Sequence, residues 1–418
     1  MEEKRKVGIL LRIFFIATVV FAVTSFINSK DDNNSINKDS VEMVVIDDEE
    51  VPCIAAIRSD NLNLVSYEIP QEADEYARRI APSMLEGVKG SETLFGVSIC
   101  NYDELYLGTP YTICDKDNMD EKKDIYYYPV YENDEIKLVL SVYRKDDKWN
   151  ATIGKDIAQE LNILASKADE SYYLYYSKGT IYAEASKACF DNTADNTLTE
   201  TSKGSNISSA TEKSSSKVVI KKNNLKEKAN GIIDSISSMF TAKPSIEVFG
   251  DYIVKDDNRT ILDTTDCLVT QLDKQGNSRG MCWAASVATI VRYVKGDYTI
   301  TAESVCEKMN IDLDEGGDME LKDKALDAYG LDYSKAYGQL TWEQVKENLD
   351  NKKPIAISCF SENEGHAVTI LGYTEVDGIR TVLFWNSGNQ KMQSATYSDE
   401  GTVFSYNSYT WEWSASLY

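Results

Sequence analysis

Residues 275–286 read QGNSRGMCWAAS, and this stretch is the best guide to the fold of the chain. From Cys282 to Val294 almost every residue is apolar, which predicts a helix that is buried on most sides and that begins at the cysteine itself. Free backbone N–H groups and the helix dipole stabilise an anion at such a position. Because the thiolate is the reactive form of cysteine, Cys282 is a candidate nucleophile.

His366, the single histidine of the chain, is the candidate partner for this thiol. It lies in GHAVTILGY (365–373), a stretch that predicts a strand, and Asn386 follows the next predicted strand in WNSG (385–388). A cysteine, a histidine and an asparagine in this order can act as the nucleophile, its general base and acid, and the group that orients the base. With no second histidine, the chain offers no rival for the base.

Two glutamines precede the cysteine in the same loop. Gln275 is the candidate for stabilising a tetrahedral oxygen, through its side-chain amide and the backbone N–H of Cys282, and Gln271 is the alternative. We expect no metal and no organic cofactor, because thiol–imidazole chemistry is complete in itself. The cysteines form no Cys-x-x-Cys pair, and one histidine leaves no Cys/His zinc pattern.

Together these motifs resemble the signature of papain-like cysteine peptidases. The resemblance rests on the Gln-Gly and Cys-Trp-Ala-Ala-Ser elements around Cys282, on PIAI (354–357) followed by GHAV (365–368), and on Trp-Asn at 385–386. The compact spacing resembles bacterial members such as the staphopains and the bacteriocin-processing peptidases. The resemblance covers roughly the last 150 to 170 residues. It implies a fold of two lobes, one helical and one an antiparallel sheet, and peptide-bond hydrolysis through an acyl-thioester on Cys282.

The chain departs from that signature at three points. Cys282 and His366 are 84 residues apart (366 − 282), fewer than the ~130–150 of papain and the cathepsins, which implies short loops. Arg279 stands where the papain element has a second cysteine, so that disulfide is missing. Gln275 is one residue further from the nucleophile than its counterpart in papain.

An export signal is predicted over residues 1–29. Lys4, Arg5 and Lys6 precede an apolar run from Ile13 to Ile27. An uncleaved signal anchor is the alternative, although the run is short for a span of ~20 residues. Either would place the rest of the chain outside the cytoplasm, so we expect a secreted protein that meets the membrane only through this segment.

Residues 41–190 predict a strand-rich α+β domain with a core of its own. Turn residues at Asn133-Asp134 and Asp146-Asp147 separate apolar runs, which is typical of consecutive hairpins. Strands are expected at 125–131, 136–143 and 148–153, a further hairpin at 171–185, and helices at 71–81 and 155–165.

A segment rich in Ser, Thr, Asn and Lys, residues 191–243, predicts a linker, with a possible amphipathic helix from Leu225 to Phe240. The remainder, residues 244–418, is the predicted peptidase domain, and its helical and strand-rich halves should leave a cleft between them. Helices are expected at 282–294, 301–309, 319–329 and 341–349, and strands at 354–360, 366–374, 381–385 and in the Tyr/Trp-rich C-terminal stretch.

The resemblance also implies a zymogen. Residues 41–190 would then be an inhibitory pro-domain, and the processing site would lie within 191–243. The partners would be a protein or peptide substrate and the chain's own N-terminal domain. A dedicated peptide-processing peptidase, a cell-wall amidase of the same fold and a non-catalytic surface-binding protein are the alternatives. The formal net charge of −24 makes nucleic acid and anionic membrane surfaces poor partners.

Overall fold

The computed structural model describes residues 43–46, 49–52, 62–115, 124–167, 171–177, 180–186, 205–206, 248–361, 364–406 and 409–418. The predicted signal segment, the helix expected from Leu225 to Phe240 and all but two residues of the linker lie outside this part. The described residues from Met43 onward belong to one compact unit. No helix within the described ranges is both long and apolar enough to cross a membrane.

The fold is mixed α+β, with large antiparallel sheets. Its described helices are α2 (Gln71–Val88), α3 (Glu92–Phe95), α4 (Ala158–Ala165), α5 (Cys282–Lys295), α6 (Ala302–Met309), α7 (Met319–Ala328) and α8 (Trp342–Asp350), with a 3-10 turn at Tyr102–Glu104. The strands before the linker are β1 (Met43–Ile46), β2 (Glu49–Pro52), β3 (Leu64–Val65), β4 (Tyr106–Leu107), β5 (Ile113–Asp115), β6 (Ile125–Glu132), β7 (Glu135–Lys145), β8 (Lys148–Gly154), β9 (Ser171–Ser177) and β10 (Thr180–Ser186). The later strands are β11 (Ser205–Asn206), β12 (Tyr252–Lys255), β13 (Arg259–Leu262), β14 (Lys335–Ala336), β15 (Ile355–Phe360), β16 (Gly365–Val376), β17 (Ile379–Asn386), β18 (Lys391–Thr396), β19 (Val403–Tyr406) and β20 (Tyr409–Leu417).

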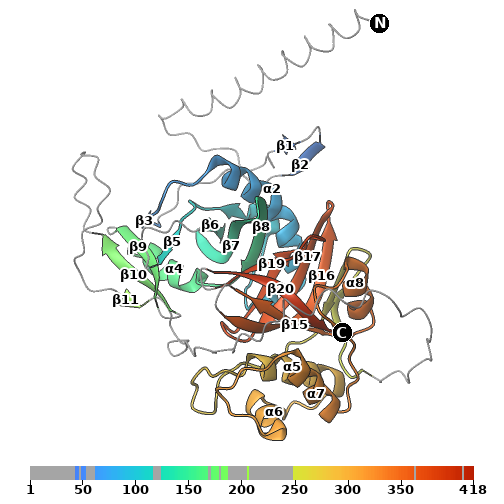
Figure 1. Ribbon diagram of the computed structural model, residues 1–418. Helices are drawn as coiled ribbons and strands as arrows, with labels where there is room; N and C mark the ends of the chain where they lie inside the picture. Colours follow the sequence, from blue (N-terminus) through green and yellow to red (C-terminus); the bar gives the residue numbers. More distant parts are fainter. Residues whose placement is uncertain are drawn as a thin grey trace, which may run out of the picture. The chain divides into compact units, whose positions relative to one another are not determined.

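One large sheet organises the molecule. Its strands follow the order β14-β20-β15-β16-β17-β18-β8-β7-β6-β4, and β12, β13 and β19 pair with one another or with strands of this path. Neighbouring strands along the path are antiparallel. Figure 1 shows α5, α6 and α7 together below the strands of the C-terminal region and α2 above them.

Strands β16 and β17 are buried on both faces. Ile370 and Phe384 belong to the hydrophobic core that α5, α6 and α7 cover. Their neighbours in the chain, Leu371 and Leu383, belong to a second core on the other face, beneath α2. Because successive side chains of a strand point to opposite faces, these strands need a nearly continuous apolar sequence, and they have one.

The helix boundaries follow from local chemistry. The side chains of Thr301 and Thr341 accept hydrogen bonds from the third residue of α6 and of α8, and both helices have a complete capping box. Helix α2 continues through Pro82 to Val88, beyond the predicted end at residue 81. Helix α4 begins at Ala158 rather than at 155, because Asp156 has a positive φ of 35° that interrupts a helix.

The three strands predicted within 125–153 form as consecutive hairpins. Asn133 and Asp134 have φ values of 50° and 65°, and Asp146 and Asp147 have values of 49° and 62°. Positive φ at both central residues is the geometry of the two-residue turns that connect antiparallel strands. The turn sequences therefore set the register of β6, β7 and β8.

The region before the linker does not stand apart from the region after it. Strand β8 pairs with β18, with Gly154 opposite Gln393 and Ile153 opposite Ser394. One hydrophobic core lies largely within residues 62–183, but the core beneath α2 is shared by both regions. The predicted separate core is thus only part of what stabilises the described residues before the linker. Strand β18 pairs with the outer edge of β8, and the C-terminal strands cover the apolar face of α2.

Candidate active site

Cys282 is the first residue of α5, as the sequence predicted, and its side chain is buried, with 6% of its surface exposed. The residue before the helix, Met281, provides no side-chain cap, so the first N–H groups of α5 are available to an anion at the thiol. A Cβ on Gly280 would lie 2.7 Å from the carbonyl oxygen of Asp314. Glycine is therefore required where the chain enters the helix.

A second loop is fastened to this entry. The guanidinium of Arg279 donates two hydrogen bonds of 2.6 Å to the carboxylate of Asp314, and a third of 3.2 Å to Asp273. Paired bonds of this kind fix geometry as well as charge. Arg279 stands where the papain signature has a second cysteine, so an ion pair joins the two loops at a position where that signature has a disulfide. The six described cysteines are all free thiols: Cys100, Cys114, Cys267, Cys282, Cys306 and Cys359.

The thiol of Cys282 and the ring of His366 are hydrogen-bonded to each other. Burial opposes the thiolate, but the hydrogen bond and charge of His366, the backbone N–H of Ala367 and the charge of Lys322 outweigh it, so the pKa of Cys282 is lowered. Burial also opposes the imidazolium, but the thiolate and Asn386 raise the pKa of His366. The two shifts favour a thiolate–imidazolium pair, the reactive form of such a site.

Asn386, at the end of β17, holds the other side of the imidazole ring. Its Oδ1 lies 2.8 Å from Nε2 of His366, which leaves Nδ1 for the thiol. The same oxygen accepts the N–H of Gly388 at 3.0 Å, and Nδ2 donates to Oε1 of Gln393 at 3.3 Å. Asn386 is 1% exposed, so its amide orientation is fixed from three directions. No sequence motif points to Gln393.

Two aromatic side chains from the β19–β20 hairpin cover His366. The ring of Tyr406 is stacked on the imidazole, with centroids 5.5 Å apart and an interplanar angle of 20°, and the ring of Trp411 meets it at 5.8 Å and 61°. A Cβ on Gly388 would come within 2.7 Å of the Tyr406 hydroxyl. These contacts limit the access of water to the bond between His366 and Asn386. The sequence predicts strands in this Tyr/Trp-rich stretch, but no motif there points to a part in the site.

The two candidate glutamines occupy different environments. Gln275 is exposed at the tip of a turn, where its backbone N–H bonds to Asp273. Gln271 is 8% exposed, and its Oε1 accepts the hydroxyl of Ser387, the residue after Asn386, at 3.2 Å. Its Nε2 donates to Ser278 Oγ and to the carbonyl of Arg279, both at 3.1 Å. The structure thus brings the alternative glutamine, and not Gln275, to the residues beside the site.

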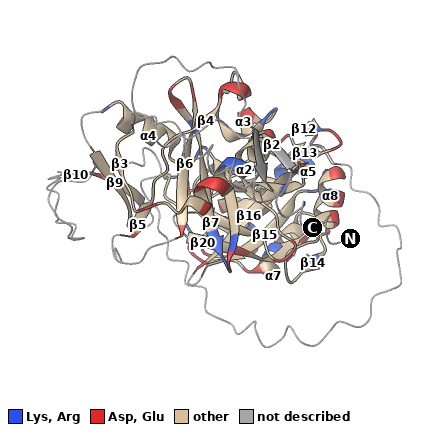
Figure 2. Cartoon of the chain, turned by 90° about the horizontal axis from the view of Figure 1, so that it is seen from above, with Lys and Arg blue, Asp and Glu red and all other residues tan. Residues whose placement is uncertain are grey.

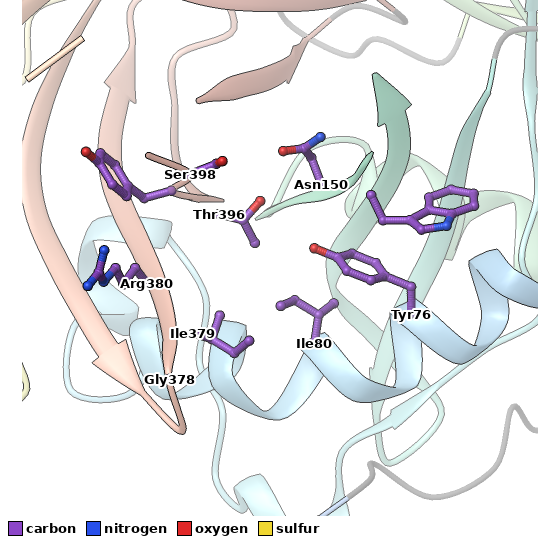
Figure 3. A pocket seen from close by; sticks show the side chains of 10 residues that line it. Tyr76, Ile80, Asn150, Gly378, Ile379, Arg380, Thr396 and Ser398 are labelled. Carbon is purple, nitrogen blue, oxygen red and sulfur yellow. The ribbon is translucent and has the colours of Figure 1, made fainter. Parts of the chain in front are cut away.

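A small cavity lies at the junction between α2, β8 and the β17–β18 side of the sheet (Figure 3). Its volume is about 150 Å³, and none of its lining residues belongs to the site around Cys282. Arg380 at its wall bonds to Glu375 and Asp399, and Thr396 bonds to the backbone of Ala151. These two polar groups of its wall are therefore already satisfied by the protein.

Fold and site together define a cysteine peptidase-like domain: a mixed α+β region in which a thiol at a helix N-terminus meets a strand histidine held by an asparagine. Residues 267–412 match the family model of the Peptidase_C39 like family, and the matched segment contains Cys282, His366 and Asn386. This match supports a cysteine peptidase and does not extend to the region before the linker. No curated protein matches the chain.

Proposed function

We propose that the protein is a papain-like cysteine endopeptidase that hydrolyses peptide bonds through an acyl-thioester on Cys282. The observation that carries this proposal is the series of hydrogen bonds from Cys282 through His366 to Asn386, of which Cys282 and Asn386 are buried. The thiolate attacks the carbonyl carbon, and His366 gives its proton to the leaving amine as the C–N bond breaks. His366 then takes a proton from water, whose oxygen attacks the thioester. The C–S bond breaks, and the carboxylic acid and the thiolate of Cys282 are released, which restores the thiolate–imidazolium pair.

The tetrahedral oxygen formed in both steps needs hydrogen-bond donors. The backbone N–H of Cys282 at the start of α5 is one, and Gln271 is the better placed of the two glutamines for the other, with one of its Nε2 hydrogens turning from Ser278 or Arg279 to the oxygen when substrate binds. In support, Gln271 is buried and tied to Ser387, whereas Gln275 is exposed. Gln271→Ala should lower kcat by about 10²-fold or more, while the matched change Gln275→Ala should leave it within twofold. Equal effects of the two changes would contradict this assignment.

In this proposal the chain is exported and made as a zymogen, with a protein or peptide as substrate. Support comes from the predicted signal over 1–29 and from the composition of residues 191–243, where processing would occur. Tyr176 of β9 packs edge-on against Tyr409 of β20 at 5.6 Å, so the N-terminal region contacts the hairpin that carries Tyr406 and Trp411. Inhibition would act through that contact. Acidic residues are spread over both regions (Figure 2), which agrees with a partner other than nucleic acid.

The proposal is tested by incubating the purified full-length protein and following its fragments by mass spectrometry. The wild type should be cut within residues 191–243, and Cys282→Ala should stay whole. Cys267→Ala is the matched control, because Cys267 is also buried but its pKa is raised to about 11, mainly by burial. Casein should be cleaved by the same proteins that cut themselves, and purified peptidoglycan, assayed in parallel, distinguishes an amidase. Casein cleavage by Cys282→Ala would refute the proposed function.

A further inference from the structure

Lys322 of α7 is buried, with only 1% of its surface exposed. A lysine is almost never buried this fully unless it is paired with a carboxylate. Within the described residues, no ion pair joins Lys322 to an acid. Its Nζ instead donates to Ser358 Oγ at 2.6 Å and to the carbonyl oxygen of Ile357 at 3.2 Å, both on β15. The charge is thus held in place by one neutral side chain and one backbone group, and no structural pairing explains it.

The residues that hold Lys322 lie next to the candidate active site. Strand β15 pairs with β16, so that Ser358 is opposite Ala367 and Cys359 is opposite His366. The backbone N–H of Ala367 bonds to the sulfur of Cys282. A short path of contacts therefore leads from the ammonium, through two paired strand residues, to the thiol.

We propose that Lys322 is a positioning residue whose buried positive charge, held by β15, stabilises the thiolate of Cys282. This inference rests on the proposed function, in which that thiolate is the nucleophile. Because the ammonium donates to Ser358, the residue opposite Ala367, it also fixes the strand pair from which both His366 and the Ala367 N–H reach the sulfur.

The charges around Lys322 agree with this role. Asp318 faces it from its own helix, Cys282 from α5 and Cys359 from β15. Burial lowers the pKa of Lys322 to about 8, so the side chain is still charged at neutral pH. Burial raises the pKa of Cys359, so that thiol is neutral there. On α6, burial likewise raises the pKa of Cys306, to about 12. Of the groups that face the ammonium of Lys322, only the thiolate of Cys282 and the carboxylate of Asp318, just before the helix, can therefore carry a negative charge at neutral pH.

The same charge acts on His366, where it disfavours the imidazolium. While the thiolate is present, it offsets this effect. Once Cys282 is acylated, the negative charge is gone, and the ammonium then favours the neutral imidazole. A neutral imidazole is the form that accepts a proton from the attacking water. Lys322 thus supports the second half of the reaction as well as the first.

The test is the pH dependence of Cys282 alkylation by iodoacetamide in the full-length protein, followed by mass spectrometry from about pH 4 to pH 10. In Lys322→Met the inflection should move upward by on the order of one pH unit, because an opposite charge near the thiol is lost. Lys335→Met is the matched control. It removes an exposed lysine of β14 that pairs with Glu320 and Asp323 of α7, the helix that carries Lys322, and it should leave the inflection in place. An unmoved inflection in a folded Lys322→Met protein would overturn the inference.

A second variant separates charge from hydrogen bonding. Lys322→Gln removes the charge but keeps an N–H donor, so its inflection should move as far as that of Lys322→Met. A shift with methionine alone would assign the effect to the donor and overturn the proposed role of the charge. Peptide hydrolysis is measured on the same proteins. If the inflection moves but the wild type cleaves no peptide, the role of Lys322 stands and the proposed peptidase function fails. If the wild type cleaves peptides but the inflection of Lys322→Met does not move, the proposed function stands and the role of Lys322 fails.

Discussion

Replacing Asn386 by alanine removes the group that orients the candidate general base. Asn386 Oδ1 lies 2.8 Å from His366 Nε2, and the amide is 1% exposed, so water does not readily take its place. Without this acceptor the imidazole ring can rotate, and the imidazolium formed in the reaction loses a partner. We therefore expect both a slower reaction and a smaller fraction of thiolate at Cys282.

The size of the effect can be worked out from these contacts. A hydrogen bond to a charged group contributes about 1.5–3 kcal/mol. At about 1.4 kcal/mol for each tenfold change in rate, this corresponds to a loss of roughly ten- to hundredfold in kcat/KM. The alanine also leaves the N–H of Gly388 without its partner and removes one of the two donors to Oε1 of Gln393, which should lower the free energy of unfolding by about 1–3 kcal/mol.

The assay is kcat/KM for a fluorogenic peptide at a temperature well below the Tm of the variant. Asn389→Ala is the matched control. The Nδ2 of Asn389 also donates to Oε1 of Gln393 at 3.3 Å, and its Oδ1 accepts the N–H of Lys391, but it makes no bond to His366. If folded Asn386→Ala kept its kcat/KM within twofold of Asn389→Ala, the hydrogen bond would not orient the histidine and the reasoning would be wrong.

Peptide hydrolysis should follow a bell-shaped pH profile, rising as the pH passes the lowered pKa of Cys282 and falling as it passes the raised pKa of His366. A rate that rose only near pH 9.0, the ordinary pKa of the thiol, would contradict the thiolate–imidazolium pair. Gly280→Ala should lower the free energy of unfolding by about 1–3 kcal/mol, since its Cβ would meet the Asp314 carbonyl at 2.7 Å, and an unchanged denaturation midpoint would count against this contact. Lys322→Met should raise stability below about pH 8, because the folded state depresses the pKa of that lysine from 10.5 to about 8. The gain in the free energy of unfolding is roughly 3 kcal/mol at most, less the cost of the lost hydrogen bonds, and it should vanish as the pH approaches 10.5. A difference in stability between variant and wild type that did not vary with pH would argue against a buried charge.

The elements that the sequence predicted best carry their own local signals. Helix α5 follows from a nearly continuous apolar run, and α6 and α8 follow from capping boxes at Thr301 and Thr341. Paired Asn and Asp residues mark the turns of the β6–β7–β8 meander. Cys282, His366 and Asn386 were singled out because each follows or begins an element with a clear pattern, and these three lie together in the structure. Their roles in catalysis remain predictions.

What the sequence did not predict depends on contacts between distant segments. Strand β18 reads KMQSAT, which is too polar to indicate a strand, yet it is buried because β17 and β8 pair with its two edges. Lys322 looks like a solvent-facing helix residue until β15 covers it. One available signal was missed: β16 and β17 are apolar at consecutive positions, which indicates a second layer on their far face. That layer is α2, from the region before the linker.

The pairing of β8 with β18 has a consequence for any fragment that begins after the linker. Such a fragment would leave the edge of β18 without its neighbour and would uncover Leu371 and Leu383, which α2 shields. Open strand edges beside apolar surface are templates for aggregation. A cut within residues 191–243 should therefore yield a nicked protein whose halves stay together, and the C-terminal half made alone should be poorly soluble until the N-terminal half is added back.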